Sequence, residues 1–197
     1  FPGLPILLLG HSMGSFLARA YLSRYGGELA GAVICGTSGP VAAAGAGRAL
    51  ARLIGAVRGE HYRSALLGKL AFGAYLARIP SPRTEFDWLS RNEPDIDRYI
   101  ADPYCNFTFT ANGFRKLLGV LCAVSRRGWA ATVPAELPLL LVAGAEDPVG
   151  QKGRHAGQDK EPDRAHGARD HHDHVPVNGL GQAHPAVLLY QLSFIGR

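Results

Sequence analysis

The chain has 197 residues, of which 47% are hydrophobic, 9% aromatic and 19% charged, and its formal net charge is +5. This length and composition fit one globular domain, or one domain with an insertion, and exclude wholesale disorder and a repeat architecture. The basic residues are scattered along the chain and no apolar run is long enough to cross a bilayer, so we expect neither nucleic-acid binding nor stable membrane insertion.

The first 40 residues predict a strand, a helix and a second strand. Residues 4–9 (LPILLL) are a short apolar run, typical of a buried parallel strand. Residues 16–25 carry apolar side chains at the spacing of an amphipathic helix, and the predicted apolar face comprises Phe16, Leu17, Ala20 and Tyr21. Residues 29–35 (LAGAVIC) read as the next strand. Two strands joined by a helix are expected to be parallel neighbours with a right-handed crossover.

The middle of the chain, residues 41–135, is predicted to be an inserted helical cap. Residues 42–53 and 62–76 have helical composition and spacing, and most of the aromatic residues lie in this part. One interpretation is a helical subdomain with its own core. The other is a cap that lines an apolar substrate pocket, because such pockets lie between domains. The two interpretations are compatible.

The last part of the chain begins with one more apolar strand and then changes character. Residues 136–150 contain the predicted strand 137–143 (LPLLLVA) and a loop with acidic residues. Residues 151–197 form an atypical tail that holds six of the eight histidines, and only its segment 186–195 reads as a helix or strand. The fold class is therefore α/β: a mostly parallel sheet built by residues 1–40 and 136–150, with the cap between them.

The segment Gly10-His11-Ser12-Met13-Gly14 stands between the first strand and the helix and has the Gly-x-Ser-x-Gly pattern of a nucleophile elbow. Such a turn is tight, so its glycines allow the strand and helix to approach while the serine hydroxyl projects from the sheet. The Met13 amide would lie at the helix N-terminus, where it can stabilise an oxyanion. A purely structural turn is the alternative. We read His11 as packing at the elbow.

A nucleophilic serine needs a base, and the base needs a carboxylate to orient it. Asp147 follows the third strand, which places it at the same sheet edge as Ser12. Glu146 competes for the role, and an Asp-Pro turn is the structural alternative. His174 and His184 are the candidate bases.

The consecutive Asp and His residues at 170–174 also suggest a metal site. We do not favour it, because consecutive residues rarely converge on one ion.

Three segments carry a resemblance to a known family: 4–40 with GHSMGS, 84–114 with FDWLSR, and 137–150. Together they resemble the α/β-hydrolase superfamily, in particular the monoacylglycerol lipase and lysophospholipase branch that is also grouped with serine aminopeptidases. The resemblance implies Ser12 as nucleophile, Asp147 as acid and Met13 as an oxyanion donor. It implies hydrolysis of small lipid-like carboxylic esters without a metal or organic cofactor. The alternatives are a peptidase or amidase of the same fold, and a catalytically inactive fragment.

The chain departs from this family in two places. Family members carry several strands before the elbow and, roughly thirty residues after the acid, a histidine in a Gly-x-x-His context. In residues 151–197 His184 has that context but lies 37 residues past Asp147. We therefore expect a chain that lacks the N-terminal half, with one apolar edge of the sheet exposed. The tail suggests a shifted reading frame or a replaced segment, in which case neither His174 nor His184 is the base.

The three cysteines, Cys35, Cys105 and Cys122, are an odd number without a Cys-x-x-Cys spacing. They are expected to be buried free thiols, which favours a reducing, cytoplasmic compartment. The sequence gives no indication of the oligomeric state.

Overall fold

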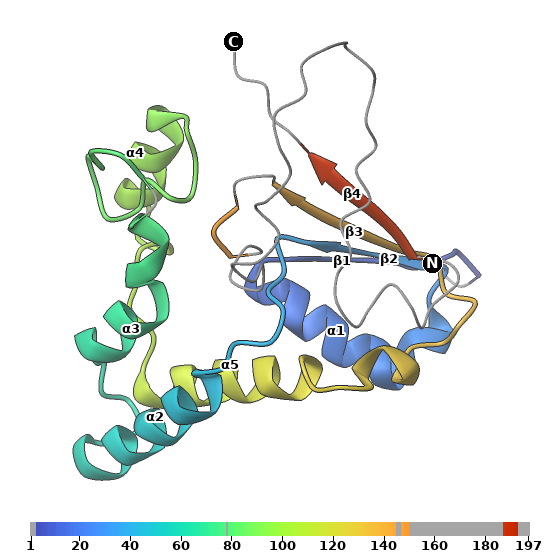
Figure 1. Ribbon diagram of the computed structural model, residues 1–197, viewed down its shortest axis with the longest axis horizontal. Helices are drawn as coiled ribbons and strands as arrows, with labels where there is room; N and C mark the ends of the chain where they lie inside the picture. Colours follow the sequence, from blue (N-terminus) through green and yellow to red (C-terminus); the bar gives the residue numbers. More distant parts are fainter. Residues whose placement is uncertain (1–2, 78, 145–146, 150–186, 193–197) are drawn as a thin grey trace, which may run out of the picture. The chain divides into compact units, whose positions relative to one another are not determined.

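Four strands among the described residues form one parallel sheet. The computed structural model describes residues 3–77, 79–144, 147–149 and 187–192. Within these ranges the strand order is β1-β2-β3-β4, and every neighbouring pair is parallel. The strands are β1 (Leu7–His11), β2 (Gly31–Cys35), β3 (Leu139–Gly144) and β4 (Val187–Leu192) (Figure 1). The predicted α/β class with a parallel sheet is therefore confirmed.

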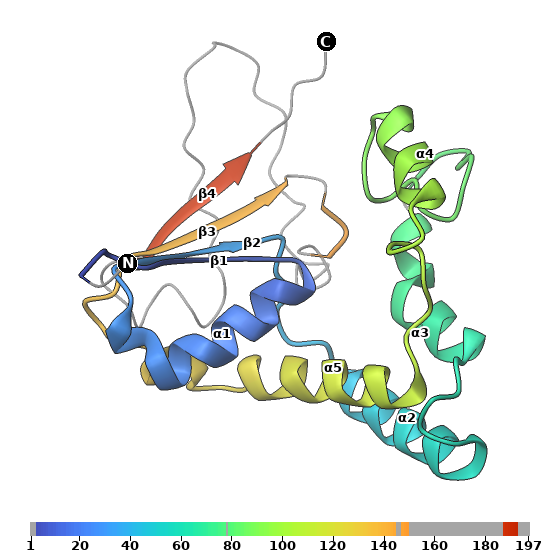
Figure 2. The same cartoon turned by 180° about the vertical axis from the view of Figure 1, so that it is seen from behind.

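The first helix, α1 (Met13–Tyr25), connects β1 to β2 and lies along one face of the sheet in both views (Figures 1 and 2). The short 3-10 helix η1 (Gly26–Glu28) follows it. Leu7 pairs with Gly31 and His11 with Cys35, so the carboxyl ends of β1 and β2 are level. In β2 the side chains of Ala32 and Ile34 are buried, as expected for an inner strand.

The buried face of α1 differs from the predicted one. Leu17 and Tyr21 are exposed, whereas Ser15, Ala18, Arg19 and Leu22 are buried. These buried positions follow the i, i+3, i+4, i+7 pattern of a helix face. The prediction was right for Phe16, which is buried, and wrong for Leu17 and Tyr21. Hydrophobicity alone placed the predicted face, whereas the short connection from β1 sets which side of the helix faces the sheet.

Gly10 allows the close approach of β1 and α1. A Cβ atom at this position would lie 2.6 Å from the Ala18 Cβ and 2.6 Å from the Gly14 carbonyl oxygen. Real Cβ atoms essentially never come this close to other heavy atoms. A Cβ at Gly14 would meet no heavy atom of the described chain within 4 Å. The steric requirement for glycine therefore falls on Gly10.

Arg19 is only 3% exposed and holds three segments of the chain together. Its guanidinium donates hydrogen bonds to the Ser38 carbonyl oxygen at 2.9 Å, to Thr37 Oγ1 at 3.3 Å and to the Val124 carbonyl oxygen. The guanidinium also lies 4.7 Å from the centre of the Trp129 ring, whose indole N–H donates to the Arg19 carbonyl oxygen at 3.1 Å. Burial lowers the pKa of Arg19 to about 10, so the group stays charged at neutral pH.

The chain divides into two compact units. The first comprises Phe1–Val41 and Val120–Arg197, and the second is Ala42–Gly119. The second unit contains the helices α2 (Ala44–Arg58), α3 (Ala65–Leu76), α4 (Glu93–Ala101) and the start of α5 (Ala111–Val124), which ends in the first unit. The 3-10 helix η2 (Trp129–Thr132) precedes β3. No helix among the described residues has the length and hydrophobicity needed to cross a membrane.

The second unit has a hydrophobic core of its own. Phe114 is its largest member and is almost fully buried. It packs with Ala51, Leu67 and Ala111, which brings α2, α3 and α5 together. Ser64 precedes α3 and its hydroxyl accepts a hydrogen bond from the Leu67 amide at 3.4 Å, which is the expected N-cap interaction.

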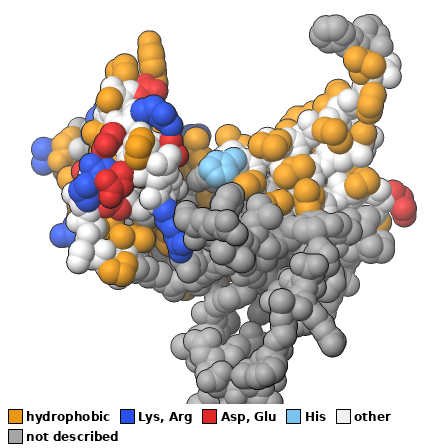
Figure 3. All heavy atoms as spheres, turned by 90° about the horizontal axis from the view of Figure 1, so that it is seen from above, with side chains coloured by type: hydrophobic (Ala, Val, Ile, Leu, Met, Phe, Trp, Pro, Cys, Tyr) orange, Lys and Arg blue, Asp and Glu red, His pale blue; other side chains and the backbone are white. Residues whose placement is uncertain are grey.

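The expected exposed apolar edge lies at β1. Among the described residues β1 pairs only with β2, and the side chains of Leu7 and Leu9 are 75% and 68% exposed. The visible face of the first unit is dominated by hydrophobic side chains, whereas charged side chains of both signs gather on the second unit (Figure 3). The three cysteines are free and only partly buried.

We predict that Gly10→Ala destabilises the protein by about 1–3 kcal/mol, because the added methyl group must displace Ala18 or the backbone of Gly14. Gly14→Ala is the matched control. It adds the same methyl group within α1, where it meets no described atom, and a helical alanine is favoured over glycine by up to about 1 kcal/mol. Urea unfolding followed by circular dichroism measures both. Equal midpoints for the two variants would contradict the proposed close approach.

We predict that Arg19→Met lowers the free energy of unfolding by about 3 kcal/mol, since the Ser38 and Val124 carbonyl groups lose a charged donor while remaining buried. Arg24→Met, on the exposed side of the same helix, should change it by less than about 0.5 kcal/mol. The same unfolding measurement applies. The interpretation fails if the two methionine variants are equally stable.

Candidate active site

Ser12 occupies the turn between β1 and α1 in a strained backbone conformation. Its φ is +51° and its ψ is −121°, a region that residues other than glycine rarely adopt. Its amide donates a hydrogen bond to the Cys35 carbonyl oxygen at 3.0 Å, and its carbonyl oxygen accepts one from the Ser15 amide at 2.9 Å. Such strain is of order 1–3 kcal/mol and persists only where neighbouring contacts hold the backbone.

A chain of hydrogen bonds connects the Ser12 backbone to the buried arginine. Ser15 is fully buried, and its hydroxyl lies within hydrogen-bond distance of the Ser12 carbonyl oxygen and 2.8 Å from Thr37 Oγ1. Thr37 in turn accepts from Arg19. Ser15 has one hydroxyl proton, so when it donates that proton to the Ser12 carbonyl oxygen, Thr37 donates to Ser15 and every member donates towards the Ser12 carbonyl oxygen. The charged guanidinium thereby supports the turn through two hydroxyl groups.

The N-terminus of α1 carries no negative charge of its own. Ser12 is the N-cap residue, yet its side chain makes no capping hydrogen bond, and the first turn of the helix contains no acidic residue. The first amides of a helix, here those of Met13 and Gly14, have no intrahelical acceptor, and the helix dipole adds partial positive charge there. This end of α1 can therefore stabilise an anion, and the Ser12 hydroxyl is not engaged as a cap.

Asp147 lies at the carboxyl end of β3, close to the ends of the neighbouring strands. Its amide donates to the Gly144 carbonyl oxygen at 3.1 Å, and its Oδ1 accepts from the Val149 amide at 2.8 Å. A Cβ built on Gly36 would lie 3.3 Å from Asp147 Oδ2 and 3.5 Å from His11 Nε2. Gly36 has a φ of +56°, so this position suits glycine for both conformational and steric reasons.

The end of β2 lies between Ser12 and Asp147. Cys35 accepts the Ser12 amide hydrogen bond, and its thiol is close enough to Asp147 to respond to its charge. Burial and the Asp147 carboxylate both raise the pKa of Cys35. Ser12, Cys35 and Asp147 thus share one edge of the sheet, as expected for residues that follow parallel strands.

Several predicted residues lie outside the described part of the chain. His174, His184 and Glu146 belong to this group, as does the segment 170–174. Within the described ranges no group of three His, Cys, Asp or Glu side chains is arranged to hold a metal ion. His11 is exposed, and its ring lies over Gly36.

The sequence interpretation missed three residues at this site: Ser15, Arg19 and Thr37. They give no motif, because a serine, an arginine and a threonine at these spacings are usually exposed. The one available signal was an arginine on the helix that directly follows the elbow, within two turns of Ser12. Its burial depends on packing that only the structure provides.

Comparison with known proteins finds ester hydrolases. The chain is 35% identical over 147 residues to a monoacylglycerol lipase of Mycolicibacterium smegmatis, covering 74% of this chain and 45% of that protein. A thermostable carboxyl esterase from Bacillus coagulans, solved in complex with glycerol, is 30% identical with a TM-score of 0.71, over 78% of this chain and 50% of that one. A monoacylglycerol lipase from Paleococcus ferrophilus has a TM-score of 0.58 at 17% identity, and the match covers 98% of this chain and 60% of that one. At this identity the likeness shows the fold alone.

The chain spans about half the length of the relatives that it matches. The family described as serine aminopeptidase, S33, matches residues 1–172. This match covers most of the chain, includes Ser12 and Asp147, and agrees with the parallel sheet and with the α/β-hydrolase structures. The chain therefore belongs to the serine aminopeptidase S33 family of α/β-hydrolases.

Proposed function

We propose that the protein hydrolyses carboxylic esters and that Ser12 is its nucleophile. The observation that supports this most directly is the strained, uncapped Ser12 at the start of α1. A serine used only as a helix cap would direct its hydroxyl to the amides of the first turn. Ser12 makes no such bond, which leaves its oxygen available to attack a carbonyl carbon.

The oxyanion formed by that attack would be bound by the Met13 amide. An amide at the first helical position has no intrahelical acceptor and is oriented with the helix dipole, so it favours developing negative charge. The hydrogen bonds from Arg19 through Thr37 and Ser15 would hold the turn in place while the charge forms. A donor that is positioned in advance needs no rearrangement during the reaction.

The proposed acid is Asp147, and the proposed base is a histidine in residues 151–197, with His174 and His184 as candidates. The histidine would take the proton from Ser12 Oγ as the bond to the acyl carbon forms, and then give it to the leaving alcohol oxygen. In the second half of the reaction, water would attack the acyl carbon, the histidine would take a proton from that water, and the proton would return to Ser12 Oγ as the acid leaves. Asp147 already accepts a hydrogen bond from Val149 through Oδ1, so Oδ2 is the atom left for the histidine N–H.

A monoacylglycerol or a lysophospholipid is the proposed substrate class. Two relatives carry the names monoacylglycerol lipase and carboxyl esterase, which supports an ester of a lipid-like acid. A peptidase or amidase is the second candidate, because the family description names an aminopeptidase and the same catalytic groups cleave both bonds.

Ser12→Ala should abolish hydrolysis of p-nitrophenyl butyrate and labelling by a fluorophosphonate probe, since both need the Ser12 hydroxyl. Ser23→Ala is the matched control. It removes a hydroxyl from the same helix and should leave both signals within about twofold of the parent. Aminoacyl p-nitroanilides measured beside the ester separate peptidase from esterase activity. A parent chain that neither turns over ester nor takes the label would identify an inactive fragment and refute the proposal for this chain.

Asp147→Asn should lower kcat for the ester by about 10⁴-fold with little change in KM, because the base loses its orienting carboxylate. The asparagine oxygen can still accept from the Val149 amide, so the loop is kept. His174→Ala and His184→Ala, measured in parallel, should include one variant with a comparable loss. If Asp147→Asn retains full kcat, Asp147 is not the acid.

A further inference from the structure

We propose that the second unit contains a binding groove for a small molecule that carries a phosphate group. The groove runs along α2 and is bordered on α5 by Arg115. It has a volume of about 780 Å³, and its lining includes three arginines, Arg48, Arg52 and Arg115. The rest of the lining includes Ala49, Leu53 and Ala56. This site is separate from the residues proposed for ester hydrolysis, and the inference does not depend on that proposal.

The three arginines come from two helices and line the same groove. Arg48 and Arg52 are four residues apart on α2 and therefore lie on the same helix face. Arg115 on α5 is already oriented, because its Nη2 donates to Asn112 Oδ1 at 2.7 Å and lies 3.4 Å from Glu60 Oε1. The side chains of Ala49 and Ala56 are small, so the space between the arginines remains open.

The charge around the groove is unbalanced. Residues 42–60 and 111–119, which build it, carry five basic side chains and one acidic side chain, Glu60. Among the residues that the structure describes, no carboxylate forms an ion pair with Arg48 or Arg52. Like charges one helical turn apart are destabilising. An anionic ligand would remove this repulsion.

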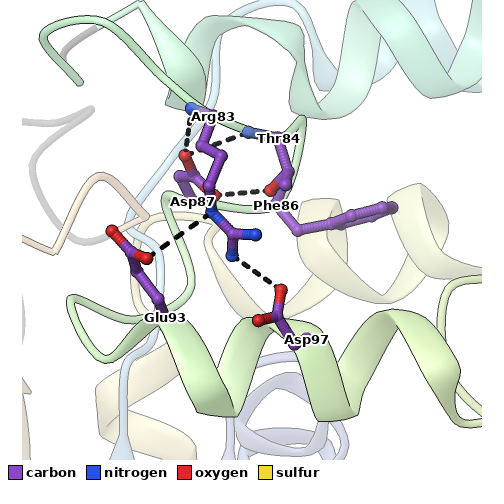
Figure 4. Close-up of polar contacts among 6 residues, drawn as sticks. All are labelled: Arg83, Thr84, Phe86, Asp87, Glu93 and Asp97. Carbon is purple, nitrogen blue, oxygen red and sulfur yellow. Dashed lines mark hydrogen bonds and ion pairs between the residues drawn. The ribbon is translucent and has the colours of Figure 1, made fainter.

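Two arginines near α4 are paired with carboxylates of the protein. Arg83 forms ion pairs with Asp97 at 2.7 Å and with Glu93 at 3.9 Å (Figure 4). Arg98 is paired with Asp95 on its own helix. Among the described residues, carboxylates thus pair with Arg83 and Arg98 near α4, whereas Arg48 and Arg52 on α2 have no such partner.

A phosphate monoester matches this groove in charge, shape and size. Its charge near −2 at neutral pH complements the two guanidinium groups that lack a carboxylate partner, and planar guanidinium groups bind phosphate oxygens through paired hydrogen bonds. The groove is larger than a phosphate ion needs, and Leu53 and the alanines offer an apolar surface for an attached organic group. The shared recognition element is thus the phosphate, whether free or esterified.

The test is a titration of the full chain at constant ionic strength with inorganic phosphate, sn-glycerol 3-phosphate and 1-hexanoyl-glycerol 3-phosphate, followed by calorimetry and by backbone amide NMR shifts. We expect saturable binding that shifts amides of α2 and α5. The tightest of the three probes identifies free phosphate, a polar ester or an acyl ester as the ligand type. Glycerol alone should not bind.

The variant Arg48→Gln/Arg52→Gln should weaken binding of the tightest probe at least about tenfold, since it removes two charged donors from the site. Arg98→Gln is the control, because it removes an exposed positive charge from the same unit outside the groove. Arg115→Gln provides a second test that leaves α2 intact, and circular dichroism verifies folding. The absence of saturable binding, or equal weakening by Arg98→Gln, would overturn the proposal. Because binding is measured without turnover, an inactive Ser12 would not affect this result.

Discussion

The contact between the start of α1 and the end of β1 is the constraint on which the rest of the first unit depends. Gly10 is the point of closest approach, and a methyl group there would overlap with atoms of α1. Because the connection is so short, the rotation of α1 about its axis is determined, and with it the burial of Arg19. The positive φ of Ser12 is a further consequence, since the chain must reverse direction between the strand and the helix within this turn.

Two sources of positive charge support the backbone around Ser12 without touching its hydroxyl. One is the N-terminus of α1, which has neither a side-chain cap nor an acidic residue in its first turn. The other is Arg19, whose charge reaches the Ser12 carbonyl oxygen through Thr37 and Ser15. A buried cation is costly unless its donors are satisfied. Here three oxygens and the Trp129 ring surround the guanidinium, while its Nε–H has no hydrogen-bond partner among the described residues. Rigidity at the turn and a favourable potential for an anion thus arise from the same contacts.

Patterns with a short range in the sequence predicted the fold well. The apolar runs before Gly10 and before Gly36, with a helix between them, were sufficient for two parallel strands and their crossover. The side of α1 that faces the sheet could not be predicted in this way, because Leu17 is more hydrophobic than Arg19 and yet is the exposed residue of the two. Residues brought together from distant segments, such as Arg19 and Val124, leave no local signal. The roles of Ser12 and Asp147 remain predictions that rest on motif, order and position at the sheet edge.

The surroundings of Cys35 have a consequence for chemical probes. Its thiol is partly buried beside the Asp147 carboxylate, and both influences keep it in the neutral, unreactive form at physiological pH. Alkylating reagents such as iodoacetamide react with the thiolate, so they should modify Cys35 slowly. Cys35 is nevertheless a direct neighbour of Ser12, because its carbonyl oxygen accepts a hydrogen bond from the Ser12 amide. Organophosphorus compounds act on hydroxyl nucleophiles, so the raised pKa of the Cys35 thiol does not slow them. Iodoacetamide and an organophosphorus reagent, used side by side, can therefore distinguish modification of Cys35 from modification of Ser12.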